Sequence, residues 1–301
     1  MQTEPAVLPG HFLMNSRSPK RSGDIQTRAY VDAHVHIHRC FDLDKFFIAA
    51  ARNFHKFATR CPEGLQPRYI LCLTESSGVN YFDQLVEESE GGEFSFGSWR
   101  IDPLDSNVSL LVSHPKFGQL ELVAGRQIVT AERLEILALG TNQYWEDGQA
   151  ICDVISSVAK ANAVPVLPWG FGKWMGARRR IVVSLIERFS DGLLYLGDNG
   201  GRPQILPYPP EFAQAAEIGM KVLPGSDPLP FASEYNKPGS FGFYVDFIQD
   251  YDGVWTSICE LLRGNRVDVK GFGSPETPIR FLRNQLAMQY VMRTSRKSKS
   301  C

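Results

Sequence analysis

The stretch Tyr30-Val-Asp-Ala-His34-Val-His36-Ile-His38 decides how the rest of this chain is interpreted. Apolar and polar residues alternate along it, which is typical of a strand with one face against a core. The next segment is amphipathic, because apolar side chains recur at helical spacing from Leu43 to Phe57, and Asp42 is placed to cap the first turn. A strand followed by a helix is the basic unit of an α/β fold, and it recurs along the chain.

Other apolar segments predict strands, and the amphipathic segments between them predict helices. The predicted strands cover residues 69–73, 134–139, 164–167, 193–196 and 221–223, and the predicted helices cover 79–90, 151–159 (with Asp147 as its cap), 178–189, 210–218, 253–262 and 277–293. Residues 91–129 contain short alternating runs, which predict an antiparallel β insertion. Buried parallel strands alternating with helices favour a (β/α) TIM-like barrel. A doubly wound open sheet is the alternative, although no glycine-rich dinucleotide motif follows the first strand.

Composition indicates an ordinary globular protein. The chain has 301 residues, of which 43% are hydrophobic, so it can bury its own core and is neither a disordered nor a collagen-like chain. Its six cysteines form no CxxC pair, as expected of buried thiols in a reducing compartment. We expect a flexible segment at 1–28, a single barrel domain at 29–292 and a basic tail at 293–301.

Charge is distributed unevenly along the chain. The net charge is −1, but residues 1–28 carry +2 and residues 293–301 carry +4, which leaves −7 on the body. An acidic body argues against a nucleic-acid groove, which needs clustered cations. No apolar run reaches the length of a membrane span. The sequence therefore predicts a soluble cytoplasmic protein with neither nucleic acid nor membrane as a partner.

The histidines of the first strand predict a metal site. Strand geometry places His34 and His36 on one face and Val35 and Ile37 on the other, where the apolar pair can pack against helices. Two neutral imidazoles one strand repeat apart can chelate a divalent ion. Three of the six histidines in the chain lie within this stretch. The alternative is a polar strand end with hydrogen-bonded histidines.

Three carboxylates follow the carboxyl ends of predicted strands, where a barrel builds its active site. They are Glu75, Asp198 and Asp227, and each can act as a metal ligand or a general base. Asp198 and Asp227 also suit tight turns. Lys173, in a glycine-containing segment, and Arg178, at the start of a predicted helix, can hold an anion, although the arginines there also suit a solvated helix turn.

Together these residues resemble the polymerase and histidinol phosphatase (PHP) superfamily of metal-dependent hydrolases, over about residues 30–230. His34-Val-His36 matches the family's opening His-x-His, and the segment 225–229 is similar to its Gly-Ser-Asp-x-His, with Leu229 in place of the histidine. Ser76 stands where the family has a ligand histidine, and Gln127 stands where it has a bridging glutamate. Segments 166–170 and 196–201 are similar to two further family strand ends, the first without its histidine.

The resemblance implies a distorted seven-stranded barrel and metal-activated water that hydrolyses phosphoesters. Since several ligand positions are replaced, it implies a reduced site here, with one divalent ion (zinc, manganese or iron) held by His34, His36 and Asp227. In this scheme Asp198 or Glu75 is the base. The residues that would bind the substrate are Lys173, Arg178, Arg202 and Gln127. The amidohydrolase superfamily also has His-x-His on its first strand and is the second family that the chain resembles.

The leading prediction is a metal-dependent hydrolase that acts on a small anionic molecule such as a phosphate ester. The main alternative is a catalytically inactive PHP-like barrel that binds a metabolite or a partner protein, because family ligands are missing. A metal-assisted lyase or decarboxylase on the same barrel is a third hypothesis.

Overall fold

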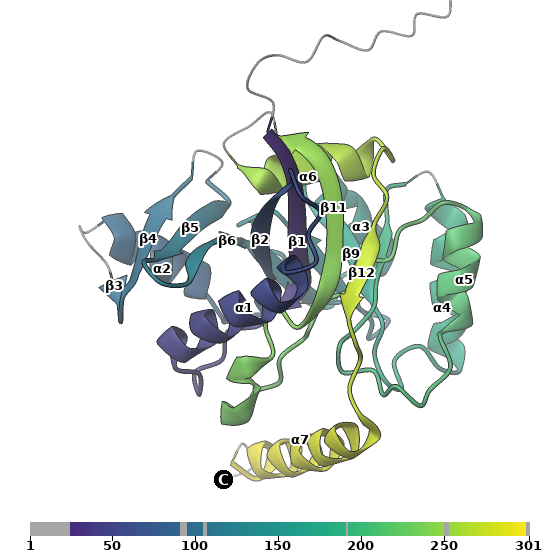
Figure 1. The fold of residues 1–301 in the computed structure, drawn as a ribbon. Helices are drawn as coiled ribbons and strands as arrows, with labels where there is room; N and C mark the ends of the chain where they lie inside the picture. Colours follow the sequence, from purple (N-terminus) through teal and green to yellow (C-terminus); the bar gives the residue numbers. More distant parts are fainter. Residues whose placement is uncertain (1–24, 91–94, 105–106, 191, 250–252, 299–301) are drawn as a thin grey trace, which may run out of the picture.

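The computed structural model describes residues 25–90, 95–104, 107–190, 192–249 and 253–298, and it contains two β-sheets. The larger sheet has the strand order β12-β11-β1-β2-β6-β5-β4-β3, and the smaller has the order β10-β9-β8-β7 (Figure 1). The strands of the larger sheet are β1 (Ile25–Val35), β2 (Gln66–Leu73), β3 (Ser95–Phe96), β4 (Trp99–Pro103), β5 (Ser109–His114), β6 (Gly118–Val123), β11 (Phe241–Gln249) and β12 (Lys270–Gly273). Those of the smaller sheet are β7 (Gly125–Val129), β8 (Glu135–Leu139), β9 (Val164–Pro168) and β10 (Tyr195–Gly197).

The strand directions correct the prediction of a (β/α) TIM-like barrel built from parallel strands. Strand β1 is parallel to β2, and β9 is parallel to β10, but β8 is antiparallel to both β7 and β9. Residues 130–134 join β7 to β8, and so short a connection makes a hairpin rather than a parallel crossover. The result is a mixed α/β fold in which the ladders form two sheets and do not close into a TIM barrel.

Three buried clusters hold the layers together. The first packs α1 (Leu43–Ala58) and α2 (Tyr81–Glu90) on the outer face of the larger sheet. The second packs α3 (Ile151–Lys160), α4 (Ala177–Arg188) and α5 (Pro210–Glu217) on the smaller sheet. The third lies between the sheets, and α6 (Val254–Arg263) covers its end opposite α7 (Figure 1). Apolar residues of both sheets and α6 fill this interior, including Ala29, Val31, Leu137, Val166 and Ile258.

Main-chain hydrogen bonds join the two sheets near His34 and Asp227, two of the predicted metal ligands. Glu75, just after β2, pairs with Arg126 of β7 in a parallel bridge. On the other side, Ala33 N donates to Pro224 O at 3.2 Å, and Leu223 N donates to Leu196 O at 2.7 Å. The segment predicted as a strand at 221–223 therefore forms isolated bridges rather than a strand. These contacts connect β1, β2, β7, β8, β9, β10 and residues 221–227 in a ring.

Two predictions about β structure need correction. The antiparallel insertion predicted at 91–129 is smaller, because β6 is parallel to β2 and continues the main sheet, while β7 belongs to the second sheet. Residues 91–94 and 105–106 of that segment lie outside the described residues. Strands β11 and β12 were not predicted, and β11 covers the edge of β1 in antiparallel register. Strand β1 itself begins at Ile25, so residues 25–28 belong to the sheet; residues 1–24 are outside the described part.

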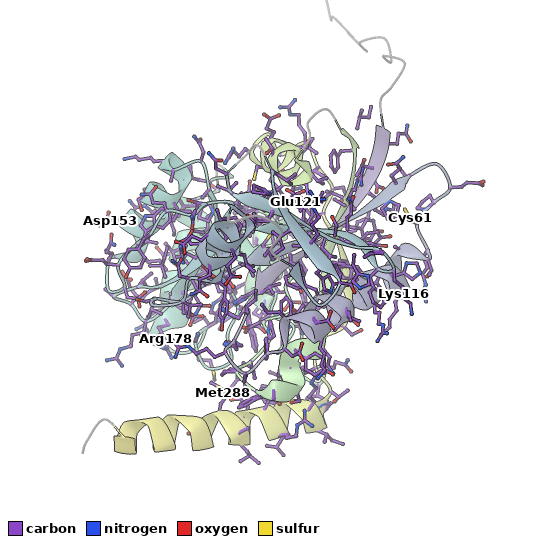
Figure 2. All side chains as sticks on the ribbon, turned by 90° about the vertical axis from the view of Figure 1, so that its left-hand side faces the viewer. Cys61, Lys116, Glu121, Asp153, Arg178 and Met288 are labelled. Carbon is purple, nitrogen blue, oxygen red and sulfur yellow. The ribbon has the colours of Figure 1, made fainter. Side chains whose placement is uncertain are left out.

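The helix starts were predicted in part. Asp42 caps α1, since its carboxylate accepts a hydrogen bond from Lys45 N. Asp147 does not cap α3: it accepts from Val129 N, and the side chain of Glu132 accepts from Ile151 N instead. Helix α7 (Pro278–Ser298) runs past the predicted end at 293, below the rest of the molecule (Figures 1 and 2). Among the described residues, no helix combines the length and the apolar character needed to cross a membrane.

Candidate metal centre

The two histidines of the site lie at the end of β1, where the strand is irregular. The register between β1 and β2 shifts between Asp32 and Val35. Val35 and Ile37 are buried in the cluster that contains α1, as the alternation predicted. The imidazoles of His34 and His36 therefore point away from α1, and their Nε2 atoms lie 3.1 Å apart.

Asp227 reaches the histidines from a segment that passes directly beside β1. A Cβ atom at Gly225 would lie 2.3 Å from the main-chain nitrogen of His34, so only glycine permits this approach. Asp227 N then donates to His34 O at 2.8 Å. The backbone of Asp227 is left-handed, with φ of +49°, a conformation that Asp tolerates better than most residues. The main chain thus fixes the carboxylate over the imidazole pair.

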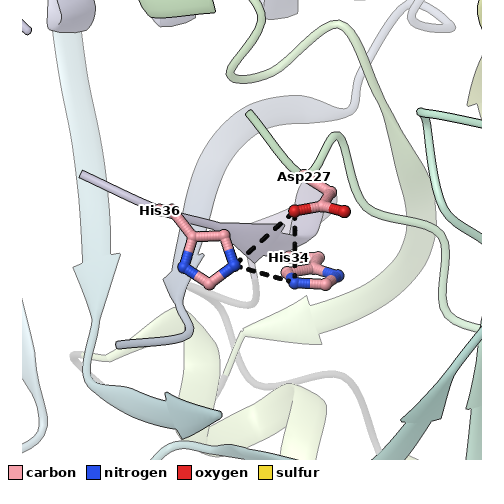
Figure 3. Close-up of side chains that lie close together, drawn as sticks. All are labelled: His34, His36 and Asp227. Carbon is pink, nitrogen blue, oxygen red and sulfur yellow. Dashed lines mark hydrogen bonds and ion pairs between the residues drawn. The ribbon is translucent and has the colours of Figure 1, made fainter. Parts of the chain in front are cut away.

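The three side chains converge on one point (Figure 3). Asp227 Oδ1 lies 3.6 Å from Nε2 of His34 and 3.6 Å from Nε2 of His36. Within the described residues, this is the one group of three or more His, Cys, Asp or Glu side chains whose ligand atoms all lie within 4.8 Å of each other. The geometric convergence predicted for His34, His36 and Asp227 is therefore present.

The separations fit a single divalent ion. Two ligand atoms bound about 2.0–2.1 Å from a tetrahedral zinc lie roughly 3.3 Å apart, and the observed 3.1 and 3.6 Å bracket that value. Nε2 of His34 also lies 3.3 Å from Gln127 Oε1. One imidazole nitrogen carries at most one proton, so hydrogen bonds alone cannot satisfy all of these neighbours. Two imidazoles and a carboxylate form a recognised ligand set that leaves a fourth position open.

The pKa shifts of His36 and Asp227 favour metal binding. Burial, followed by the charge of His34, lowers the pKa of His36 to about 3, so its imidazole is neutral at pH 7. Burial opposes ionisation of Asp227, but its electrostatic interactions with the His34 and His36 rings and with Lys237 outweigh it and hold the pKa of this carboxyl well below its usual range. A neutral imidazole and an ionised carboxylate can bind a cation without first losing a proton.

Polar residues around the three side chains hold them in place. The amide Nδ2 of Asn199 donates to Asp227 Oδ2, the carboxylate oxygen turned away from the histidines. Gln127 contacts His34 as described above, from β7 of the second sheet. Asp32 is fully buried and accepts from Ser226 N and Gly239 N, both at 2.8 Å, which ties the Asp227 segment to β1. Burial raises the pKa of Asp32 to about 6.

Lys237 links the site to helix α7. Its Nζ donates to the main-chain oxygen of Asp227 at 3.3 Å and to Glu276 Oε1 at 2.9 Å, and it lies 3.7 Å from Glu234 Oε2. Asn284 of α7 donates to the same Glu276 carboxylate. The ammonium of Lys237 is buried and its charge is matched, so it can fix the main chain of Asp227.

The other two predicted carboxylates have arginine partners. Both oxygens of Asp198 accept from Arg202 at 2.8 Å. Glu75 accepts from Arg126 at 2.8 Å and from Phe82 N at the start of α2, and burial raises its pKa. Neither belongs to the group that converges on His34 and His36.

Three residues predicted to hold the substrate are also engaged elsewhere. Lys173 pairs with Glu135, and Arg202 pairs with Asp198. Arg178 donates to Gly172 O at 2.7 Å. Of the four predicted substrate-binding residues, only Gln127 contacts the candidate metal ligands, through His34. The three basic residues have other partners.

Sequence reasoning missed several residues that shape the site. Asn199 lies in a segment noted for its similarity to a family strand end, and His38 is the third histidine of the first strand, so both had a signal. The ring of His38 stacks on that of His36, with centroids 5.6 Å apart, and its Nε2 lies 2.9 Å from Pro228 O. Lys237 had no signal, because its role depends on partners that are distant in the sequence.

Comparison with known proteins gives a fold but no family. A scan against models of protein families and a search of curated proteins each find no match. Among solved structures, PsfC from Pseudomonas syringae is similar, with a TM-score of 0.54 and 12% identity over 89% of this chain and 99% of that chain. At this identity the likeness establishes a shared fold alone.

Two more distant resemblances concern proteins whose names describe nucleases or phosphoesterases. The lesion-specific endonuclease PfuEndoQ from Pyrococcus furiosus gives a TM-score of 0.44 at 11% identity, over 79% of this chain and 56% of that one. A two-domain protein from Bacteroides vulgatus that contains a predicted PHP-like metal-dependent phosphoesterase gives 0.41 at 15% identity, over 88% and 70%. These scores are too low to bear on function.

Proposed function

We propose that this chain is a metal-dependent hydrolase of the PHP type, in which His34, His36 and Asp227 hold one divalent ion. The observation that carries the proposal is the convergence of two Nε2 atoms and a carboxylate oxygen at 3.1–3.6 Å, from segments far apart in the sequence. The resemblance of the sequence motifs around these residues to PHP motifs is the reason for proposing this family. Zinc, manganese and iron all accept two imidazoles and a carboxylate.

We further propose that the ring formed by β1, β2, β7, β8, β9, β10 and residues 221–227 is a distorted seven-stranded barrel of the PHP type. Its support is the set of main-chain bridges that connect these segments around the site. In this arrangement each site residue comes from a different place on the ring: the histidines from β1, Gln127 from β7 and Asp227 from the segment after β10.

The proposed site holds one ion. By its resemblance to the family, Gln127 stands where a bridging glutamate is expected, and an amide would have no charge to bridge two ions. When bound, the ion supplies a Lewis acid and lowers the pKa of a coordinated water to about 7 in the best cases. The chain itself supplies the ligands, held by Asn199, Asp32 and Lys237, and the amide of Gln127 beside His34.

The role of base needs a side chain with a lone pair that no other group uses. Arginines hold Glu75 and Asp198, so we assign both to positioning: Glu75 bonds the start of α2, and the main chain of Asp198 accepts from Gly225 N at 2.9 Å. We assign the base to His38. Its Nε2 donates to the carbonyl of Pro228, so Nδ1 is an acceptor when the ring is neutral, and burial lowers the pKa of His38, which favours that neutral form.

A panel of small phosphomonoesters tests this function. The full chain is loaded in turn with Zn²⁺, Mn²⁺ and Fe²⁺, and phosphate release is measured for the wild type, Asp227→Asn and Glu75→Gln. We expect release with at least one ion, a loss of about 100-fold or more in Asp227→Asn, and little change in Glu75→Gln. Metal binding without turnover of any ester would favour the inactive barrel. Release of CO2 or another non-hydrolytic product from carboxylated substrates would favour the lyase.

A further inference from the structure

A pocket of about 300 Å³ lies beside the candidate metal centre, between residues 37–39, which follow β1, and the start of helix α2. His38 forms one wall, and its ring stacks on that of His36, so a single side chain separates the pocket from a proposed ligand. The opposite wall is the turn before α2, including Asn80 and Tyr81. A molecule whose reacting group lies at the metal centre could therefore place a neighbouring group here.

The lining of this pocket has a positive charge. Among the described residues that line it, Arg39 alone is charged, and the other polar side chains are those of His38, Asn80, Tyr81 and Gln84. Within the part of the chain that the structure describes, no carboxylate lies within ion-pair distance of Arg39, so its charge is available to a bound anion. Arg39 and Tyr81 both line the pocket, so one ligand can contact the guanidinium and the phenol. Burial raises the pKa of Tyr81, and the charge of Arg39 opposes this rise.

This arrangement differs from that of the basic residues predicted from the sequence. Lys173 and Arg202 each pair with a carboxylate, and a paired cation has little attraction left for an anion. Arg39 is instead exposed and lies three residues from His36. A guanidinium can bind an oxyanion through two hydrogen bonds, and a neighbouring phenol and amide can add donors.

We propose that this pocket, built around Arg39 and Tyr81, binds a phosphate-like oxyanion. As part of catalysis the proposal rests on the function proposed above, and it narrows the substrate to molecules with a second anionic group next to the one that reacts. The binding itself needs no metal, because the ion would lie on the far side of the His38 ring. Arg39 and Tyr81 are then specificity residues of the reaction.

Phosphate binding to the metal-free protein tests the pocket separately from the metal centre. The full chain is treated with a chelator and titrated with inorganic phosphate by calorimetry, with sodium chloride at equal ionic strength as the blank. We expect saturable binding that weakens about tenfold or more in Arg39→Gln and less in Tyr81→Phe. Arg60→Gln is the matched control, since Arg60 is also exposed and lies outside the pocket.

The proposal is overturned if the metal-free wild type shows no saturable phosphate binding, or if Arg39→Gln binds phosphate as tightly as the wild type or no more weakly than Arg60→Gln. With the loaded enzyme, a sugar monophosphate and its bisphosphate give a second readout. Arg39→Gln should raise KM about tenfold for the bisphosphate and leave kcat within about twofold, with no change for the monophosphate. An equal change for both substrates would contradict the assignment. If no metal ion binds at all, the function fails while the phosphate titration still decides the pocket.

Discussion

Carboxylates that follow strand ends are held in two opposite ways in this molecule. Glu75 and Asp198 each face an arginine, Arg126 and Arg202, at 2.8 Å. Asp227 instead faces two imidazoles, and the nearby ammonium of Lys237 contacts its main-chain oxygen rather than its carboxylate. An arginine carries a permanent charge that neutralises its carboxylate partner, whereas imidazole nitrogens can bind a cation together with the carboxylate that they face.

The difference shows what a strand-end position does and does not imply. All three carboxylates looked equivalent from the sequence because each follows an apolar run. What separates them is the side chain that faces each one, and this depends on strand pairing. The first three predictions below each alter one side of this contrast, beginning with the largest expected effect, and the fourth concerns a buried carboxylate outside it.

Removing the arginine from the paired side should destabilise the fold without affecting the ion. Arg126→Met leaves Glu75 buried and unpaired, which costs about 3–5 kcal/mol of unfolding free energy. Urea denaturation measures this loss. The double variant Glu75→Gln/Arg126→Met should recover part of it. If the metal affinity of a folded Arg126→Met protein falls by more than about threefold, then the Glu75–Arg126 pair and the group around Asp227 are not independent.

Removing the charge of Asp227, which faces the two imidazoles, should weaken metal binding and leave the stability of the fold nearly unchanged. Asp227→Asn keeps the shape and tolerates the left-handed backbone, so the fold should survive. Loss of a ligand charge should weaken metal binding about 100-fold or more, because changes even in residues behind the ligands cost 10–100-fold. Calorimetric titration with Zn²⁺ measures the affinity, and Glu75→Gln is the matched carboxylate control. Equal affinities in the two variants would refute the contrast.

The support behind Asp227 should matter less than the ligand itself. Lys237→Met removes the ammonium that bonds the main chain of Asp227, and we expect about tenfold weaker metal binding. Lys237→Arg should restore part of the affinity. Lys173→Met is the control, because Lys173 is paired with Glu135 away from the site. If the metal affinity of Lys237→Met is unchanged, then the bond from Lys237 to the main chain of Asp227 has only a structural role.

Replacing Glu121, a buried carboxylate outside both groups, should have the smallest effect. It should change how the unfolding free energy depends on pH. Burial raises the pKa of Glu121, whose oxygens accept from Val254 N and Trp255 N at the start of α6. The folded protein then binds more protons than the unfolded chain above pH 4.5, so this group's contribution to stability falls as pH rises toward its folded pKa. A tenfold difference in proton affinity between the folded and unfolded chains corresponds to about 1.4 kcal/mol.

Glu121→Gln tests this sign. The variant keeps one acceptor oxygen but does not titrate, so its unfolding free energy should rise relative to the wild type between about pH 4 and pH 7. Parallel pH profiles for the two proteins would contradict it.

Features of the fold that depend on neighbouring residues in the sequence were predicted correctly. The helix from Leu43, its Asp42 cap and the common face of His34 and His36 all follow from periodicity and capping chemistry. Strand β11 was not predicted although Phe241, Phe243 and Val245 alternate, because its place in the sheet depends on antiparallel pairing with β1, more than 200 residues earlier in the chain.

The candidate site was predictable in its ligands and not in its surroundings. Asp227 could be paired with the histidines through motif resemblance, and the geometry brings the three together. Arg202 follows Asp198 by only four residues, so that ion pair had a local signal that was overlooked. Arg126 meets Glu75, and Lys237 meets Glu276, only through the tertiary fold. No sequence pattern reports such partners.

Metal content is the most direct test of the central claim that His34, His36 and Asp227 form one metal site. The full chain is purified without chelator, and its metals are counted by mass spectrometry beside the double variant His34→Ala/His36→Ala. We predict about one zinc, manganese or iron per wild-type chain and less than about a tenth of that in a folded variant. A wild type without tightly bound metal after reconstitution, or a variant that retains the full amount, would contradict the account.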